Sequence, residues 1–317
     1  MIEVNPSQTT AAAQPATRSR KRRLKSDWLI GYLFILPWAI GFLCFTAGPF
    51  LASLFLSMTD WRIIGAFKWV GLGNYTTIFT QDPRFLKTLF NTLYYVAFVV
   101  PGVNVIGLTF AMLLNQKLKG IAIYRTVFYM PAVTSGVATS ILWAWMFNPR
   151  FGLINSVLAM IGIQGPEWLV SDVWAMPSII IMSLWNIGQP MIIYLAGLQG
   201  VPRHLEEAAE MDGAGWWQKF RNVTIPMLTP SIFFNVVMGI IGSFQVFTTV
   251  YVVTQGGPAE STLVYVLNLY YTAFQNFRMG YASALAWILF VIILAFTGIQ
   301  FLVSRSWVYY EGGGRGA

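Results

Sequence analysis

Charge is scarce in this sequence. Only 10% of the 317 residues are Asp, Glu, Lys or Arg, and 56% are hydrophobic, whereas a soluble domain carries about 25% charged residues. So few polar side chains cannot cover a water-soluble core of this size. The composition therefore excludes a soluble globular protein and predicts an integral membrane protein. The net charge of +8 does not indicate nucleic-acid binding, because the basic residues lie mostly beside hydrophobic segments, where they orient the chain in a membrane.

Residues that hold metals, haem or phosphate are also scarce. The chain has one cysteine, Cys44, and one histidine, His204, so it can form no internal disulfide and no zinc or haem ligand set. We interpret Cys44 as a small apolar residue and His204 as a surface residue. The sequence contains no Gly-Lys dipeptide and no G-x-S-x-G, which excludes a Walker phosphate loop. We expect no catalytic residue, no metal site and no cofactor bound by this chain.

Six hydrophobic segments are long enough to cross a bilayer, which takes about 20 apolar residues. The predicted spans cover residues 28–58, 88–115, 127–147, 174–199, 228–254 and 281–304. None of them contains Asp or Glu, although carriers driven by protons or sodium usually keep an ionisable group at membrane depth. Prolines and glycines interrupt several spans, either because these helices line a pathway or because they are kinked within a packed bundle.

Lys and Arg predict the orientation. With six spans, the two termini and the loops 116–125 and 201–226 share one side, which holds 14 basic residues, and the other side holds 6. The richer side is expected to be cytoplasmic, in the plasma or inner membrane. The predicted organisation is a disordered basic cytoplasmic tail over 1–27, a six-helix transmembrane domain over 28–305 and a short cytoplasmic tail over 306–317.

The loop over 201–228 is the longest polar interruption in the second half of the chain. It contains four of the twelve acidic residues. Pro202 suits the first turn of a helix, and Gly213 can adopt the left-handed conformation that ends one. A second short helix is expected over 214–222, with Pro226 stopping it before the fifth span. Such a helical hairpin can enter a groove on another protein or lie on the lipid surface as an interfacial helix.

The loop resembles the EAA loop of the membrane subunits of ABC importers. The matching residues are Glu207-Ala208-Ala209, Asp212-Gly213-Ala214, Phe220 and Ile225-Pro226. Four other stretches are similar to motifs of the carbohydrate branch of that family. They are Gly71-Leu72-Gly73-Asn74-Tyr75, Ser243-Phe244-Gln245-Val246-Phe247, Thr254-Gln255-Gly256-Gly257-Pro258 and Gly280-Tyr281-Ala282-Ser283-Ala284.

The resemblance implies an all-α, six-helix type I importer permease. Such a permease pairs with a second, commonly non-identical permease subunit, two ATPase subunits that hold ATP and Mg, and an extracytoplasmic sugar-binding protein. ATP-driven closure of the ATPases would move the EAA loop and switch the pore between inward- and outward-facing states. Carried over by position, the ATPase-coupling residues are Glu207, Ala208, Ala209, Asp212, Gly213, Ala214, Phe220 and Pro226.

The predicted substrate path lies in the two spans that flank this loop. A mono- or oligosaccharide needs hydrogen-bonding side chains and flat aromatic faces. The candidates are Trp185, Asn186, Gln189, Gly239, Gly242, Ser243 and Gln245. The maltose-type subunit of the family has asparagines where this chain has Ser243 and Val246, and a serine where it has Gly239. Either the sugar differs or the sister subunit binds it, and each polar residue can instead serve an interhelical hydrogen bond.

Three other functions remain open from the sequence. The chain could be a secondary carrier or channel that works without an ATPase, an ABC permease for an amino acid, phosphate or peptide, or a structural membrane scaffold. The polar loop and the lack of acids in the spans disfavour the first, and the carbohydrate-branch motifs disfavour the second.

Overall fold

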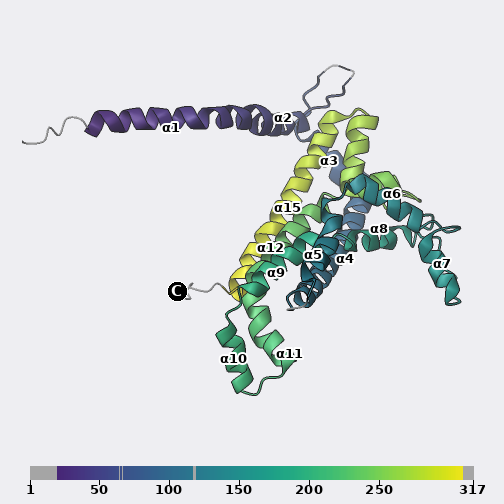
Figure 1. Cartoon of the computed structure of the whole chain (residues 1–317). Coiled ribbons are helices and arrows are strands. Elements are labelled where there is room, and N and C mark those ends of the chain that lie inside the picture. Colours follow the sequence, from purple (N-terminus) through teal and green to yellow (C-terminus); the bar gives the residue numbers. More distant parts are fainter. Residues whose placement is uncertain (1–19, 64, 66, 117–118, 310–317) are drawn as a thin grey trace, which may run out of the picture. The chain divides into compact units, whose positions relative to one another are not determined.

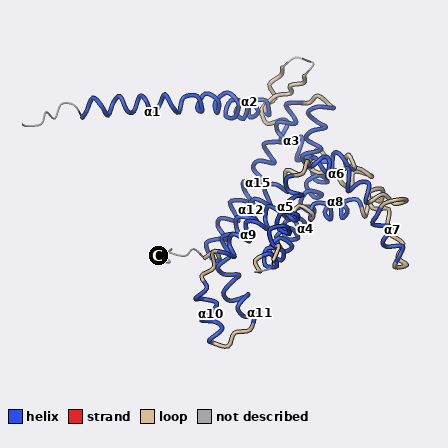
Figure 2. Tube along the Cα trace, in the orientation of Figure 1, coloured by secondary structure: helices blue, strands red, loops and turns tan. Residues whose placement is uncertain are grey.

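The computed structural model describes residues 20–63, 65, 67–116 and 119–309. Helices dominate this part of the chain, as Figure 2 shows, and its β structure is one isolated bridge between Thr59 and Trp69. The all-α class that the resemblance implies is confirmed. The chain divides into two compact units, Met1–Phe55 and Leu56–Ala317.

The first unit contains one long helical stretch. Helix α1 covers Arg20–Phe42, a π-helical turn (η1) covers Leu43–Ala47, and α2 covers Gly48–Ser57 and crosses the boundary between the units. Residues 20–27 were predicted to be disordered, but they form the first turns of α1. Residues 1–19 of the predicted tail lie outside the described residues.

Pro49 and Pro226 lie inside continuous helical stretches, and a wider turn precedes each of them. The ring of proline clashes with the carbonyl four residues earlier, and proline has no N–H to donate. Before Pro49, the Gly48 N–H bonds to the Leu43 carbonyl, five residues back. Before Pro226, the Ile225 N–H bonds to the Phe220 carbonyl in the same way. These π-turns widen the helix locally, so the prediction that Pro226 stops the helix is wrong.

Four helical stretches among the described residues are long and apolar enough to cross a membrane individually. They are Ile30–Ser57, Pro83–Leu114, Trp216–Val253 and Met279–Trp307. The second is α4, whose N-cap Asp82 accepts a hydrogen bond from the Arg84 N–H at 2.9 Å. The third comprises α11 (Trp216–Lys219), the π-turn η2 (Phe220–Thr224), α12 (Ile225–Phe244) and, after a break at 245–247, α13 (Thr248–Val253). The fourth is α15.

The other two predicted spans are bent pairs of helices. Helices α5 (Ile121–Val133) and α6 (Gly136–Met146) meet at 99°, and α8 (Ala175–Leu184) and α9 (Gly188–Gln199) meet at 42°. The prediction of one helix over 127–147 is therefore wrong. At this bend Thr134 is extended, with ψ 146°. Pro190 explains the break between α8 and α9, because it cannot donate a hydrogen bond to the Asn186 carbonyl four residues earlier.

Short helices connect the spans. They are α3 (Gly73–Thr80), α7 (Leu153–Met160), α10 (Arg203–Met211), α14 (Tyr265–Tyr270) and a π-turn, η3 (Tyr271–Gln275). Figure 1 shows α10 and α11 at one end of α9 and α12, opposite the end at which α15 begins. This arrangement puts the polar loop at a single end of the helices that it connects.

Two of the sequence motifs meet at one corner of the second unit. The Asn74 amide donates to the carbonyls of Ser57 and Thr59, at 2.8 Å each. Gly280 lies so close to the same segment that an added Cβ would come within 1.9 Å of the Thr59 carbonyl oxygen. The Tyr281 hydroxyl donates to Asp82 at 2.7 Å. The stretches 71–75 and 280–284 therefore hold a loop between helices.

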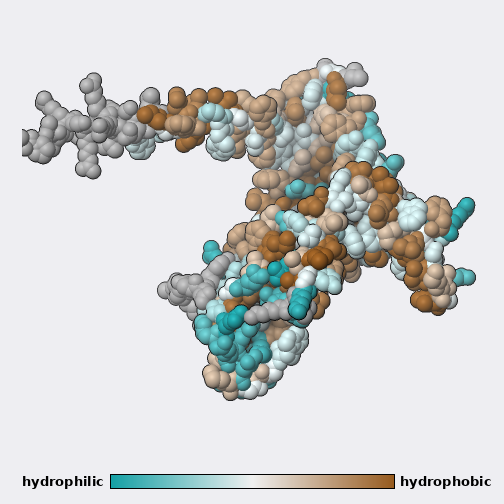
Figure 3. All heavy atoms as spheres, viewed as in Figure 1, coloured by the Kyte–Doolittle hydropathy of each residue, from teal (hydrophilic) through white to brown (hydrophobic). Residues whose placement is uncertain are grey.

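Helix α4 lies at the centre of the second unit and packs against α8, α9 and α12. At one end of this contact Ala111, Met191 and Leu228 are fully buried. Many large apolar side chains on the outside remain exposed, such as Phe290 and Leu294 on α15, as expected for helices solvated by lipid tails. Figure 3 shows hydrophilic surface gathered over α10.

Candidate functional site

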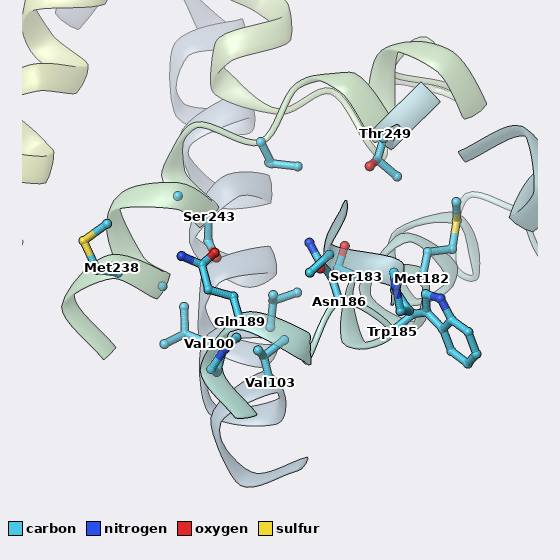
Figure 4. Close-up of a pocket in the computed structure, with 18 of the residues that line it drawn as sticks. Val100, Val103, Met182, Ser183, Trp185, Asn186, Gln189, Met238, Ser243 and Thr249 are labelled. Carbon is cyan, nitrogen blue, oxygen red and sulfur yellow. The ribbon is translucent and has the colours of Figure 1, made fainter. Parts of the chain in front are cut away.

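A cavity of about 620 Å³ lies between α4, α5, α6, α8, α9, α12 and α13. Six of the seven predicted substrate-path residues line it: Trp185, Asn186, Gln189, Gly239, Gly242 and Ser243. In Figure 4, Gln189 and Ser243 lie toward one side of this space, and Asn186 and Trp185 lie toward the other. The seventh, Gln245, does not line the cavity. It is the exposed C-cap of α12.

The break between α8 and α9 presents three of these residues to the cavity. Trp185 and Asn186 lie in the break, and Gln189 lies in the first turn of α9. Gly188 permits this placement because an added Cβ would lie 3.1 Å from the Phe128 carbonyl oxygen of α5. The helix restart imposed by Pro190 and the close approach of α5 together fix this wall of the cavity.

Some polar side chains of the cavity already have partners in the protein. The Tyr95 hydroxyl donates to Ser183 at 2.8 Å, and the Tyr194 hydroxyl donates to the Asn104 carbonyl oxygen. The Asn104 amide donates in turn to the Val100 carbonyl at 2.7 Å. Asn235 donates to the Pro190 carbonyl at 3.4 Å. These residues tie α4, α8, α9 and α12 together, and sequence reasoning did not include them in the site.

Other polar side chains of the cavity have no protein partner. Within the described residues, the side chains of Asn186, Gln189 and Ser243 make no hydrogen bond to the protein. Ser243 is only 9% exposed. A buried polar group normally finds a partner, so these donors and acceptors are available to a solute or to water.

Aromatic and neutral groups complete the cavity. Trp185 is 54% exposed, and its ring meets that of Trp143 edge-on, at 5.9 Å between centroids. An added Cβ on Gly242 would meet nothing within 4 Å, so this glycine leaves space open. No Asp, Glu, Lys, Arg or His is among the described lining residues. The cavity offers hydrogen bonds and ring faces without charge.

Helix α10 forms the first half of the polar loop. It ends in a Schellman motif: the Ala214 N–H bonds to the Ala209 carbonyl at 2.9 Å, and the Gly213 N–H bonds to the Glu210 carbonyl at 3.0 Å. Gly213 has φ +77°, so the left-handed conformation predicted from the sequence is present. Helix α10 has no buried residue, and Met211 at its end is 84% exposed. This helix is therefore a folded but uncovered surface.

The second half of the loop carries exposed aromatic rings. Trp216 and Phe220 stack at 5.7 Å with an angle of 2°, and Trp217 contacts both. Lys219 forms an ion pair with Glu210, which fastens α11 to α10. Glu207 and Asp212 are exposed and have no ion pair within the described residues. The hairpin is thus held internally while its motif acids stay available.

The loop is anchored to the membrane helices by close packing. An added Cβ on Gly197 of α9 would come within 2.6 Å of the Ser231 hydroxyl and 2.8 Å of Leu228, both on α12. The Thr229 hydroxyl accepts a hydrogen bond from the Tyr309 N–H at 2.9 Å, beyond the end of α15. The contact at Gly197 fixes the spacing of α9 and α12, which carry both the loop and the cavity.

The described residues contain no group of His, Cys, Asp and Glu able to hold a metal ion.

Residues 70–309 match the model of the family described as binding-protein-dependent transport system inner membrane component. The "Probable ABC transporter permease protein YesP" of Bacillus subtilis is 44% identical over 92% of this chain and 96% of its own length. The lactose transport system permease protein LacF of Rhizobium radiobacter is 36% identical over 92% of this chain and 99% of its own length.

Among solved structures, a bacterial ABC transporter involved in the import of the acidic polysaccharide alginate is similar in fold. Its matching chain has a TM-score of 0.76 and 25% identity, over 90% of this chain and 98% of that one. Together with the family match, this likeness confirms the predicted permease fold. This chain is a multi-pass membrane protein that belongs to the family of binding-protein-dependent transport system inner membrane components.

Proposed function

We propose that this chain is a pore subunit of an ATP-driven sugar importer. The observation that carries the proposal is that one pair of helices, α9 and α12, holds both an uncharged cavity with unpartnered polar groups and an exposed, rigidly capped hairpin. A solute can bind at one end of this pair while a second protein acts on the other.

The hairpin would receive the force. Its helix α10 presents Glu207, Ala208 and Ala209 without covering them, and small residues let another protein approach closely. Glu207 would pair with a basic group or a helix N-terminus on an ATPase subunit. Gly213 would keep the turn rigid. The close contact of Gly197 with Leu228 would transmit the displacement to α9 and α12.

The family supports a proposal for the partners. We expect a second permease subunit, two ATPase subunits that bind ATP and Mg, and an extracytoplasmic sugar-binding protein, with no cofactor and no ATP hydrolysis on this chain. The excess of basic residues on the side of the hairpin supports a cytoplasmic hairpin and cytoplasmic termini.

The cavity supports a sugar as the cargo. Sugars present many hydroxyl groups and apolar ring faces, which neutral amides, hydroxyls and indole rings bind well. Asn186, Gln189, Ser243 and Trp185 supply these groups. Relatives named for lactose and for trehalose and maltose transport point to the same class of solute.

Reconstitution tests the proposal directly. The chain is assembled in liposomes with a second permease subunit, an ATPase and a binding protein from the same organism. Uptake of radiolabelled lactose, trehalose, maltose and diacetylchitobiose is measured with and without ATP. We expect uptake of one of these sugars only with ATP and the full assembly. Uptake by the chain alone would instead establish a secondary carrier or channel.

Two neighbouring acids provide a matched test of the hairpin. We expect Glu207→Gln to lower ATP-driven uptake by about tenfold, since losing one charge-assisted hydrogen bond costs about 1.5 kcal/mol. Glu206→Gln, on the same exposed helix, should change uptake less than about twofold. Equal effects of the two substitutions would contradict a specific docking role for Glu207.

A further inference from the structure

A second pocket of about 380 Å³ lies at the opposite end of the unit from the hairpin. It is formed by the start of α4, the loop over 255–263, the helix α14 and the turn η3. We call it the loop pocket. Its lining includes Arg84, Gln255, Glu260, Asn268, Tyr271 and Gln275. The sequence motifs assign no role to these six residues beyond the match at Gln255.

Asn268 is the informative member of this lining. It is only 7% exposed, and within the described residues its side-chain amide makes no hydrogen bond to the protein. Because Asn268 lines the pocket, its unused donors and acceptor are available to whatever enters there.

The loop over 255–263, which forms another wall of the pocket, is held in an unfavourable backbone conformation. Among the described residues, four non-glycine residues have positive φ: Gln255, Ala259, Glu260 and Phe277. Three of them lie in the loop that forms this wall. Such conformations cost about 1–3 kcal/mol each and persist where surrounding contacts impose them, which is frequent at ligand sites.

Contacts from α4 and η3 impose this conformation. The Asn91 amide donates to the carbonyls of Glu260 and Leu263, at 3.0 Å each. The Tyr271 hydroxyl donates to the Gln255 carbonyl at 3.1 Å. Burial raises the pKa of this hydroxyl above its ordinary value, so it remains a donor. These contacts fix the backbone of the loop before a solute binds, which lowers the entropy cost of binding.

The charges of the pocket already neutralise one another. Arg84 pairs with Glu260 at 2.9 Å, and Lys87 lies 3.8 Å from the same carboxylate. An anionic solute would have to displace Glu260 from Arg84. A neutral solute with several hydroxyl groups can bind the amides, the carboxylate and the Tyr271 ring without breaking this pair.

Aromatic rings connect the loop pocket with the central cavity. The Tyr271 ring contacts Tyr270 at 6.0 Å, and Tyr270 contacts Phe247 at 5.1 Å and Tyr251 at 5.4 Å. Val246, next to Phe247 in the chain, and Thr249 line the central cavity. Partly exposed rings therefore extend from one pocket to the next.

We propose that the loop pocket is a second saccharide subsite, which holds the cargo before it reaches the central cavity. This inference rests on the proposed function, because it takes a sugar as the cargo and the side opposite the hairpin as the entrance. The ligand class is a neutral mono- or disaccharide, bound by Asn268, Gln255 and Gln275 and passed along the rings of Tyr271 and Tyr270.

Equilibrium binding to the assembled transporter tests the subsite. Whichever sugar of the panel supports uptake is used in radiolabelled form, with the transporter in nanodiscs and the binding protein omitted. We expect two classes of site in the unsubstituted transporter. Asn268→Ala and Gln275→Ala should each weaken one class by about tenfold, which is about 1.4 kcal/mol. Asn186→Ala should weaken the other class.

Controls separate the possible failures. Gln275 is exposed, so its substitution tests the subsite even if the buried Asn268→Ala variant assembles poorly. Gln81→Ala, also exposed and outside the pocket, should change nothing. ATP-driven uptake together with a single class of site, or with binding unchanged in both pocket variants, would overturn the subsite alone. Absence of uptake for every sugar would overturn the proposed function as well.

Discussion

The two ends of the α9 and α12 pair differ in almost every physical property. At the cavity end, side chains are neutral, and three of the described polar ones, Asn186, Gln189 and Ser243, have no protein partner. At the hairpin end, charged and aromatic side chains are exposed, and an internal ion pair and a Schellman cap keep the fold rigid. Under the proposed function, one end exchanges hydrogen bonds with a small solute, and the other binds a protein partner.

In the proposed function, this difference lets one helix pair both bind a solute and dock a protein partner. Neutral donors and acceptors release a solute readily, because each net hydrogen bond contributes only about 0.5–1.5 kcal/mol. A hairpin that transmits force must keep its shape. Backbone hydrogen bonds fix its turn at Gly213, and the close packing of Gly197 fixes the helices at its base. Substitutions at the two ends should therefore have separable consequences.

The largest effect is expected from Gly213→Val. A β-branched residue at φ +77° costs about 1–2 kcal/mol and opens the Schellman turn, so ATP-driven uptake in proteoliposomes should fall by more than about tenfold. Gly213→Asn is the matched control, because Asn tolerates the left-handed conformation, and it should keep most of the uptake. If Val and Asn behave alike, the turn geometry is not what matters at this position.

Gly242→Trp should reduce uptake about tenfold while ATPase activity of the assembly persists. The glycine borders open space in the cavity, and an indole would occupy the volume that the solute needs. Gly242→Ala should be nearly neutral, because an added Cβ meets nothing within 4 Å. Uptake and ATP hydrolysis are measured on the same proteoliposomes. Parallel loss of both activities in the Trp variant would argue for misfolding and against a blocked cavity.

Asn186→Ala should weaken sugar binding in the central cavity about fivefold to tenfold, since it removes about 1 kcal/mol of hydrogen bonding. It should leave thermal stability unchanged, because Asn186 is exposed and has no protein partner among the described residues. Asn104→Ala should show the opposite pattern, because Asn104 accepts from Tyr194. Sugar affinity and melting temperature are measured for both variants. If the two variants change both quantities alike, the distinction between free and partnered polar groups is wrong.

The smallest effect is expected from Gln245→Ala. Gln245 is exposed and lies outside the cavity lining, so sugar binding and uptake should change less than about twofold. A loss as large as that of Asn186→Ala would show that the cavity extends past the end of α12 during transport. Uptake kinetics of the two variants, measured together, decide between these outcomes.

Features of the chain were predictable where residues close together in the sequence determine the backbone conformation. Pro202 and Gly213 bracket α10 as expected, because the conformations they favour depend on few neighbours. Pro226 was misjudged because a π-turn upstream relieves its clash, and the sequence carries no signal for that turn. The 99° bend after Val133 was also missed, since a hydrophobic run of sufficient length looks the same whether it is straight or folded back.

Hydrogen bonds between residues far apart in the chain explain why the sequence did not show which polar groups of the cavity are free. Asn104 and Asn186 are alike in the sequence, each an amide inside a hydrophobic segment. Asn104 donates to the Val100 carbonyl of its own helix, and Tyr194, ninety positions along the chain, donates to its side-chain oxygen. Asn186 has no such neighbour within hydrogen-bond distance among the described residues.

Composition and the order of neighbouring residues were enough to predict the membrane class, the hydrophobic segments and the polar hairpin. The tertiary structure decided which polar groups face an open cavity, how α8 and α9 bend around it, and that Gln245 lies outside. Those properties depend on which helices meet, and helix packing is set by the shapes of side chains far apart in the chain.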